Sequence, residues 1–387
     1  MSPTTSQLSE FIRSLYQTNE FIPLHAPTFG EREKRNVLDT IESTFVSSVG
    51  EYVTRFENQV EAFTGAHRAI ATVNGTAALH AALYMAGVQS GDYVITQALT
   101  FVATCNAIHH MGAEPIFIDV AYQTMGMCPI ALESFLEEHA ITDEQNCIHK
   151  TSKRKIRACV PMHTFGHPVQ LDELLAICNK WNIELVEDAA ESLGSFYKGQ
   201  HTGTKARFSA LSFNGNKIIT TGGGGMLLCA DETEGHRAKH ITTTAKAAHP
   251  YEFYHDEPGF NYRMPNLNAA LGCAQMSHLE TFIEKKRELA EQYKAFFKSS
   301  SFQFIDEPSE CRSNFWLNAI LCEHSDLRNT VIEEQNNAGI MCRPAWHLMN
   351  RLPMFERCPR GKLTVSEDIQ SRLVNIPSSP ILKRGDQ

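Results

Sequence analysis

The sequence predicts an α/β protein, in which a large domain built around a parallel sheet is followed by a smaller α+β domain. Three observations carry this prediction. Strand-like segments alternate with helix-sized stretches through about residue 245. Carboxylates follow the apolar run at residues 183–186, and an open α/β sheet places its chemistry at such strand ends. Residues 267–298 form an uninterrupted helix-forming stretch without proline, which predicts a connecting helix into the second domain.

Each strand of the large domain is predicted from a short run of apolar and β-branched residues. The candidate strands are residues 93–96, 115–120, 158–162, 183–186 and 226–229. We assign residues 30–248 to the large α/β domain and residues 249–387 to the connecting helix and the small domain. The length of 387 residues is sufficient for two cores, and a hydrophobic content of 42% is ordinary for a globular protein.

Composition and charge argue against several classes of protein. The closest two of the eleven cysteines, Cys311 and Cys322, are eleven residues apart, so the sequence has no Cys-x-x-Cys ligand pair and no recognisable disulfide framework. Residues 1–10 have neither a basic nor an apolar signal region, and no apolar run approaches the length of a membrane span. The net charge of −9 weakens any nucleic-acid function. We therefore expect a cytoplasmic protein with no membrane or nucleic-acid partner.

Two clusters suggest ligand sites, but a simpler interpretation is favoured for each. Residues 150–157 hold five Lys and Arg among eight positions, which predicts a solvated connector more readily than a phosphate or partner patch. His163 and His167 are four residues apart, but Gly166 and Pro168 break any helix that would place them on one face. No third ligand has a suitable spacing, so we expect no metal site.

The most informative segment is a lysine followed closely by a run of glycines. Lys217 lies in a short polar turn, and residues 222–225 are all glycine. Glycines allow the backbone to approach a ligand, and Ser212 offers a hydroxyl to a phosphate. A flexible loop would have the same pattern, and the spacing matches neither common nucleotide-binding glycine motif. A lysine with glycines and a serine hydroxyl close by in sequence is what a covalently held, phosphate-bearing cofactor requires.

Asp188 follows the predicted strand at residues 183–186. An aspartate at this point could simply cap the next helix. However, Lys217 lies 29 residues downstream in a glycine-rich turn. The pair suggests pyridoxal phosphate, because Asp188 would keep the pyridine nitrogen protonated and the ring could then act as an electron sink.

Two further segments supply candidate contacts for such a cofactor. Gly75 and Thr76 precede an alanine- and leucine-rich helix, whose free N–H groups form an anion site together with the Thr76 hydroxyl. An ordinary helix cap would look the same. Phe101 follows the strand at residues 93–96, and it could stack on a flat ring or pack in the core.

These motifs together resemble the DegT/StrS family of nucleotide-sugar aminotransferases. Residues 74–79, 187–191, 212–225 and 259–264 occur in the family's order and spacing, and the resemblance covers roughly residues 20 to 382. It implies the type I fold of pyridoxal phosphate-dependent transferases, with a mixed, mainly parallel central sheet and a smaller α+β domain. It also implies that residues 1–29 pack on the small domain, and that the protein is a homodimer with shared active sites.

The resemblance assigns roles around the cofactor ring. Lys217 is expected to bind pyridoxal phosphate covalently and then to shuttle protons, and Asp188 to partner the pyridine nitrogen. Phe101 corresponds to the residue that stacks on the ring. Glu191 stands where many relatives carry glutamine near the phenolate oxygen, and a carboxylate there would have to be protonated or screened.

The remaining roles concern the phosphate and the substrate. Gly75, Thr76 and Ser212 correspond to phosphate-binding residues, and Asn261 to a phosphate contact donated by the other subunit. Four residues are expected near the sugar nucleotide or the cofactor: His163, Arg263, Arg343 and His347. Trp346 lies in the same segment of the small domain as Arg343 and His347, and each of these three could equally be a packing residue.

The implied reaction moves the amino group of L-glutamate to a nucleotide-linked keto sugar for bacterial surface glycans. The chain most resembles the legionaminic-acid pathway enzymes, which aminate the 4-keto carbon of a UDP-2-acetamido-2,6-dideoxy-hexosulose. Perosamine synthases, which use a GDP-linked 4-keto-6-deoxymannose, are close behind, and 3-amination also stays open. A non-catalytic nucleotide-binding or regulatory protein is the alternative from another class, although such a protein would be expected to lack Lys217.

Overall fold

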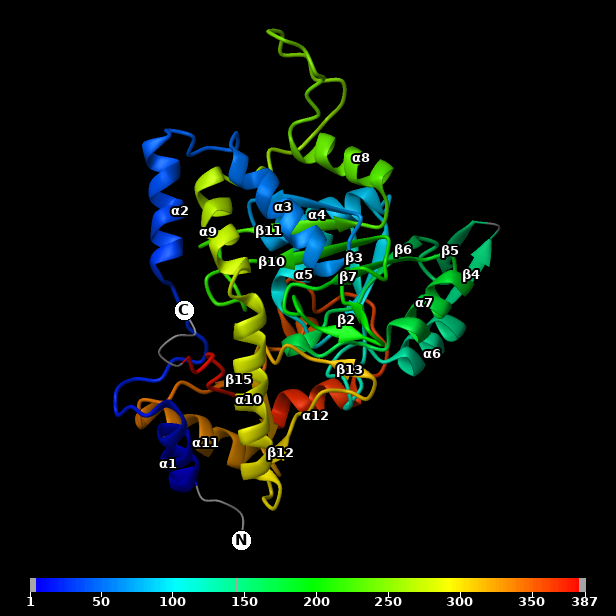
Figure 1. Cartoon of the computed structure of the whole chain (residues 1–387). Helices are drawn as coiled ribbons and strands as arrows, with labels where there is room; N and C mark the ends of the chain where they lie inside the picture. Colours follow the sequence, from blue (N-terminus) through cyan, green and yellow to red (C-terminus); the bar gives the residue numbers. More distant parts are fainter. Residues whose placement is uncertain (1–4, 144, 383–387) are drawn as a thin grey trace.

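The computed structural model describes residues 5–143 and 145–382, so the outermost residues of the predicted first and last segments, 1–4 and 383–387, lie outside the described part of the chain. A twisted central sheet forms the middle of the large domain, and helices cover both of its faces (Figure 1). None of the helices in the described residues is long and apolar enough to cross a membrane.

The central sheet is mixed but mainly parallel, as predicted. Only β11 runs antiparallel to its neighbours in the main path of the sheet, while β10, β7, β6, β2 and β3 pair in parallel. The order across the sheet is β1 (Arg68–Thr72), β11 (Gly225–Cys229), β10 (Phe208–Ser212), β7 (Glu184–Asp188), β6 (Lys155–Val160), β2 (Tyr93–Gln97) and β3 (Glu114–Ile118). A hairpin of β4 (Ala140–Asp143) and β5 (Asn146–His149) extends the sheet beside β6.

All five candidate strands form, with bounds shifted by up to three residues, but β1, β4, β5 and β10 were not among them. Strand β10 reads Phe-Ser-Ala-Leu-Ser, which breaks the apolar run expected of a buried parallel strand. The buried Ser209 hydroxyl is satisfied locally, because it donates to the Gly203 carbonyl at 2.5 Å. The expected basic connector at residues 150–157 also differs, since its last three residues already belong to β6.

Alternation along the strands places successive side chains in different cores. Val186 packs with α4 (Gly75–Met85), α5 (Val102–His110) and α8 (Glu232–Thr242) on one face. Leu185 packs with α6 (Pro129–His139) and α7 (Leu171–Lys180) on the other face. On that second face, α3 (Glu51–Thr64) and α9 (Asn266–Met276) cover the β1 side. Both faces of the sheet are therefore buried, as a parallel sheet requires.

The connector is two helices rather than the single uninterrupted helix expected from residues 267–298. Helix α9 ends at Met276, and α10 (Leu279–Phe297) begins after Ser277 and His278. The Ser277 hydroxyl donates to the Ala274 carbonyl at 2.6 Å, and the His278 N–H donates to Gln275 O at 3.0 Å, so the chain forms a tight turn between the two helices. Helix α9 thus packs against α2 (Glu31–Glu42) and α3, while α10 continues toward the small domain.

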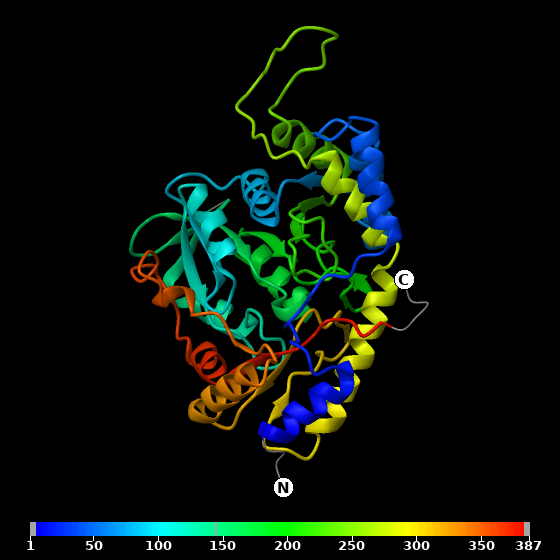
Figure 2. The ribbon, with the colours of Figure 1, turned by 90° about the vertical axis from the view of Figure 1, so that its left-hand side faces the viewer.

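The small domain is a four-stranded antiparallel sheet with helices packed against it. Its strands lie in the order β12 (Gln303–Phe304), β14 (Asn318–Leu321), β16 (Leu373–Ile376) and β15 (Arg343–Pro344). Its helices are α11 (Ser325–Asn337) and α12 (Thr364–Arg372). The N-terminal helix α1 (Thr5–Tyr16) packs along α10, as Figure 2 shows, and Ile22 exchanges backbone hydrogen bonds with Gly339 and Met341.

A long arm, residues 244–260, projects from the body between α8 and α9 in both views (Figures 1 and 2). Backbone pairing of Lys246 with His255 holds its two sides together. Three aromatic residues of the arm are exposed, namely Tyr251 at 81%, Phe253 at 81% and Tyr254 at 63%. Exposed aromatic side chains clustered on a projecting segment are typical of an interaction surface.

Candidate active site

Most of the predicted cofactor residues surround one cavity of about 310 Å³. The cavity lies where β7 and β10 end and where α4 and α5 begin. In an open α/β sheet this is the expected place for a ligand. The predicted residues that line it are Gly75, Thr76, Phe101, Asp188, Glu191, Ser212 and Lys217.

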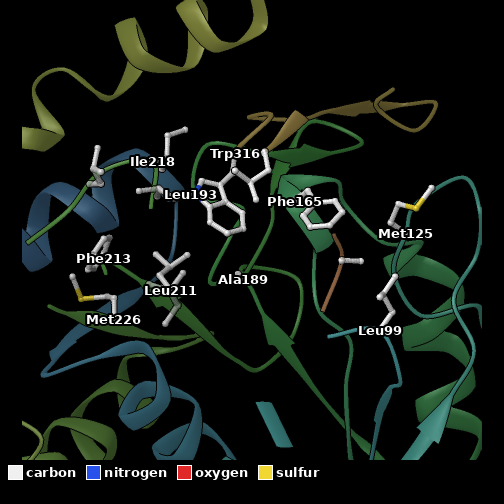
Figure 3. Close-up of a cluster of buried hydrophobic side chains, with 14 of the residues drawn as sticks. Leu99, Met125, Phe165, Ala189, Leu193, Leu211, Phe213, Ile218, Met226 and Trp316 are labelled. Atoms are coloured by element: carbon white, nitrogen blue, oxygen red, sulfur yellow. The ribbon is translucent and has the colours of Figure 1, made fainter. Parts of the chain in front are cut away.

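The turn that carries Lys217 is anchored in the core. Phe213 and Ile218 on either side of it are buried in the cluster shown in Figure 3. The Lys217 N–H donates to Asn214 O at 2.9 Å, and the Phe213 N–H donates to Gly224 O at 2.9 Å. Anchoring both flanks fixes the position from which the lysine side chain enters the cavity.

The amine of Lys217 lies between a carboxylate and an aromatic ring. Its Nζ atom is 3.4 Å from Glu191 Oε1 and 4.0 Å from the centroid of the Trp316 ring. The lysine side chain is only 12% exposed. Trp316 is itself fixed, because its indole N–H donates to Asn216 O at 2.7 Å in the same turn. The sequence analysis did not identify Trp316, whose only signal was membership of an apolar run far along the chain.

Asp188 is the last residue of β7, and its carboxylate is 5% exposed. The Thr104 hydroxyl donates to Oδ2 at 2.7 Å, and the Ala190 N–H donates to Oδ1 at 3.2 Å. Burial raises the pKa of the Asp188 carboxyl, although these donors and Lys217 act in the opposite direction. Such a carboxylate is well suited to stabilise a buried positive charge. Thr104 was also missed, since a threonine within a predicted helix carries no distinctive pattern.

Glu191 is a second buried carboxylate on the same side of the cavity, with 3% exposure. Its Oε2 atom accepts the Phe165 N–H at 2.9 Å, which leaves Oε1 to face Lys217. Burial raises the pKa of this carboxyl, the Lys217 ammonium lowers it, and the nearby Asp188 raises it again.

The phosphate end of the predicted site is the start of α4. Asn74 caps this helix by accepting the Ala77 N–H at 2.8 Å, so the preceding N–H groups have no intrahelical acceptor. A Cβ at Gly75 would lie 2.8 Å from the Ser212 Cβ, so only glycine allows β10 to approach this turn. A Cβ at Gly225 would lie 2.4 Å from the Asn74 carbonyl. Gly225 is therefore needed where two backbone segments pass close together, and not only for the lysine turn.

The residues present fit pyridoxal phosphate. A helix N-terminus with two hydroxyls, Thr76 and Ser212, lies at one end of the cavity and is suited to a phosphate. A primary amine and a buried carboxylate, Lys217 and Asp188, lie in the same cavity and are suited to a covalently bound pyridine ring. Phe101 is 48% exposed and faces Trp346 with ring centroids 6.2 Å apart, so it is available to stack on that ring.

His163 does not line the cavity. Its ring is fully buried, and both ring nitrogens have protein partners. The Val169 N–H donates to Nδ1 at 3.2 Å, so Nε2 carries the proton and donates to Glu187 Oε2 at 2.9 Å. Glu187 also accepts the N–H groups of Gly203, Lys205 and Ala206 at 2.7 to 2.9 Å. The pair of His163 and Glu187 thus acts as a brace that holds the loop at residues 203–206, just before β10, against β7.

The structure of one chain leaves four other predicted residues away from the cavity. Asn261 and Arg263 lie at the base of the arm and bond to each other, with Arg263 Nε donating to Asn261 Oδ1 at 3.0 Å. Arg343 and His347 lie in the small domain with exposed side chains. Their roles toward phosphate and substrate stay predictions that depend on a second subunit or on bound substrate. By contrast, Trp346, between the latter two in sequence, does line the cavity.

Comparison with known proteins supports the same chemistry. The model of the DegT/DnrJ/EryC1/StrS aminotransferase family matches residues 27–387. GDP-perosamine synthase of Escherichia coli O157:H7 is 35% identical over 363 residues, which cover 94% of each protein. EpsN of Bacillus subtilis (strain 168), named as a candidate pyridoxal phosphate-dependent aminotransferase, is 34% identical over 95% of this chain and 93% of that protein.

A solved structure shows the same fold. The aminotransferase TlmJ from Streptoalloteichus hindustanus superposes with a TM-score of 0.83 at 23% identity, over 94% of this chain and 95% of that one. Together with the cavity described above, these matches establish that the chain belongs to the DegT/DnrJ/EryC1/StrS aminotransferase family and is a pyridoxal phosphate-dependent enzyme of nucleotide-sugar amination.

Proposed function

We propose that this enzyme moves the amino group of L-glutamate to the 4-keto carbon of a nucleotide-linked 6-deoxy sugar used for bacterial surface glycans. The observation that carries the proposal is the position of Lys217 Nζ, which lies in the cavity beside the buried carboxylates of Asp188 and Glu191. An amine held in this way can act as a nucleophile and then as a proton carrier.

Pyridoxal phosphate, when bound, supplies the electron sink and carries the amino group between the two substrates. Asp188 then holds the proton of the ring nitrogen, and Thr104 orients that carboxylate. Lys217, once free, moves a proton at the carbon atom that loses or gains the amine. The rings of Phe101, Trp316 and Trp346 line the cavity and reduce the access of water.

Two nucleotide sugars are candidate acceptors, and each is favoured by one observation. The sequence motifs resemble enzymes of the legionaminic-acid pathway, which favours UDP-2-acetamido-2,6-dideoxy-hexos-4-ulose. The 35% identity to the E. coli GDP-perosamine synthase favours GDP-4-keto-6-deoxymannose.

A comparison of the two acceptors, each assayed separately, tests the proposal. The purified enzyme is incubated with L-glutamate and either 4-keto sugar, and the formation of 2-oxoglutarate and of the amino sugar is followed by mass spectrometry. We expect at least tenfold higher kcat/KM for the UDP-linked sugar. A preference for the GDP-linked sugar would assign the perosamine branch, and amination at carbon 3 would reject the 4-amino assignment.

The homodimer is part of the same proposal. The exposed aromatic residues of the arm and the position of Asn261 at its base favour an active site completed by a neighbouring subunit. A mixture of Lys217→Ala and Asn261→Ala subunits should regain activity, because half of the mixed dimers' sites would be intact. Subunit exchange is verified first. If activity then fails to recover, each active site is formed by one chain alone.

A further inference from the structure

The side chain of Asn314 supports two of the groups that surround the Lys217 amine. Asn314 lies in the loop that precedes β14 and is fully buried. Its Nδ2 donates to the backbone carbonyls of Glu191 and Leu193, both at 2.9 Å. Its Oδ1 accepts the backbone N–H of Trp316 at 2.8 Å. One amide group therefore uses both of its N–H groups and its oxygen to connect the residues on two sides of the amine.

Three segments that are distant in sequence meet at this amide, and Figure 3 labels one residue of each, namely Phe165, Leu193 and Trp316. A Cβ at Gly166 would overlap Asn314 Oδ1, so only glycine fits beside the amide. The Ser195 hydroxyl accepts the N–H of Asn314 at 2.9 Å and donates to Gly166 O at 2.7 Å. The N–H of Phe165, next to Gly166, donates to Glu191 Oε2 at 2.9 Å. Asn314 therefore belongs to the same packed unit that orients the Glu191 carboxylate.

The Glu191 carboxylate and the Trp316 ring form two walls around the amine of Lys217. Oε1 of Glu191 lies 3.4 Å from Nζ, and the centroid of the Trp316 ring lies 4.0 Å from it. A lysine side chain has a flexible four-carbon stem, and it loses conformational entropy when its amine is held at one point. Walls that are fixed before the cofactor binds reduce the entropy that covalent attachment still has to remove.

We propose that Asn314 is a positioning residue for the amine of Lys217. It does not line the cavity, and it acts through the backbone of Glu191 and Trp316. When its amide is lost, the two walls are no longer connected, and the amine spends a smaller fraction of time where it can attach the cofactor. The inference rests on the proposed covalent role of Lys217. A purely structural role is the alternative, because the same hydrogen bonds join the loop before β14 to the large domain.

Two substitutions remove the donors of this amide. Asn314→Asp keeps the shape and can still accept the Trp316 N–H, but its second oxygen faces the carbonyls of Glu191 and Leu193 and repels them. Asn314→Ala removes all three hydrogen bonds without adding a charge, and it serves as the test if the aspartate prevents folding. Thermal unfolding of the cofactor-free proteins shows which variants are folded.

Asn266→Asp is the matched control. Asn266 is also buried, at 2% exposure, and it does not line the cavity. Its amide likewise joins distant segments, because Nδ2 donates to Phe45 O at 2.6 Å and Oδ1 accepts the Tyr52 N–H at 3.1 Å. The control therefore makes the same chemical change in a buried asparagine that has no contact with the walls of the amine.

The measurement compares two ligands that differ in one group. Pyridoxal phosphate has the aldehyde that reacts with an amine, whereas 4-deoxypyridoxine phosphate has a methyl group in its place and keeps the ring and the phosphate. The dissociation constant of each is measured by titration calorimetry with cofactor-free protein. Changes in general stability or in net charge affect both ligands alike, so the ratio of the two constants isolates covalent attachment.

We expect both Asn314 variants to lower the preference for pyridoxal phosphate over the analogue by about tenfold. Asn266→Asp should keep the preference of wild type. An unchanged preference in a folded Asn314 variant would overturn the inference. Loss of affinity for the two ligands by the same factor is such a result, and it would assign Asn314 a purely structural role. An equal fall in Asn266→Asp would also overturn the inference, because any buried asparagine would then have this effect.

Borohydride reduction of wild type with bound pyridoxal phosphate distinguishes the two possible failures. If the reduced protein does not carry the cofactor on Lys217, the proposed covalent role is wrong. If it does, and the preference of the Asn314 variants is unchanged, only the positioning role of Asn314 is rejected.

Discussion

Two hollows of this molecule can be compared, and the predicted lysine and carboxylates lie in the smaller one. The larger, a groove of about 870 Å³, lies between the start of α6 and residues 303–309. The smaller is the cavity of about 310 Å³ that contains Lys217. Among the described residues, the groove is lined by no lysine, arginine or histidine. Two of its three carboxylates are in ion pairs, since Glu307 binds Arg287 and Asp306 binds Lys294.

The contrast indicates that buried ionisable groups facing a cavity, rather than volume, mark the candidate active site. Asp188 and Glu191 are both nearly inaccessible to solvent and have partners fixed by the fold. Keeping such groups buried costs free energy, and buried ionisable groups that face a cavity are concentrated at functional sites. None of the three carboxylates of the groove is buried, and Ile130 at its edge is 81% exposed.

The largest expected effect is that of removing the amine from the small cavity. Lys217→Ala should lower kcat/KM by on the order of 10³-fold or more, because nucleophile and proton carrier are lost together. Borohydride should then trap no covalent cofactor. Lys198→Ala, which removes a lysine paired at the surface with Asp172, should behave as wild type. A reducible adduct in Lys217→Ala would show that a different lysine holds the cofactor.

The carboxylate at the end of β7 should have the next largest effect. Asp188→Asn can still accept the Thr104 hydroxyl, but it cannot balance a positive charge on the ring nitrogen. We expect kcat to fall about 10²-fold to 10³-fold. Thermal unfolding of the cofactor-free variant should be close to that of wild type, because the isosteric amide retains the contact. A normal kcat would remove Asp188 from the cofactor site.

The small cavity was largely predictable because its residues follow local patterns. Asp188 follows an apolar strand, Gly75 and Thr76 precede a helix, and the Lys217 turn precedes four glycines. Each of these patterns is contained in a few consecutive residues. The α/β order of the large domain was predictable for the same reason, since five of its strands have recognisable apolar runs.

The parts that were missed depend on contacts between distant segments. Trp316 lies 99 residues after Lys217, and only the path of α10 brings its ring over the amine. Strand β10 has serines that look exposed in sequence but are satisfied by a loop. The break at Ser277 separates two helices that each have good helical composition, so propensity alone could not place it.

The brace beneath the small cavity should affect stability more than chemistry. Burial raises the pKa of Glu187, but the hydrogen bonds from His163 and from backbone N–H groups outweigh burial, and the pKa lies below its ordinary value of 4.5. The ionised carboxylate therefore stabilises the fold fully above pH 4.5, and this contribution is lost as the pH falls through the folded-state pKa.

Glu187→Gln should accordingly lower the free energy of unfolding by about 3 kcal/mol at pH 7, because at least one buried N–H donor loses its charged acceptor. Urea unfolding of both proteins measures this difference, which should shrink as the pH is lowered below about 4. A constant difference over this range would mean that the variant disturbs packing and that the charge of Glu187 is unimportant.

A substitution in the groove should have the smallest effect. It also tests directly whether the comparison between the two hollows is correct. Ile130→Ser removes an exposed apolar side chain at the groove's edge without disturbing the core, since Ile130 is 81% exposed. We expect kcat/KM for both substrates to stay within about twofold of wild type, and stability within about 0.5 kcal/mol.

The proper readout is KM for the nucleotide sugar, measured beside kcat. A KM raised tenfold with kcat unchanged would mean that the larger hollow binds part of the substrate. Volume would then have been as good a guide to function as buried charge.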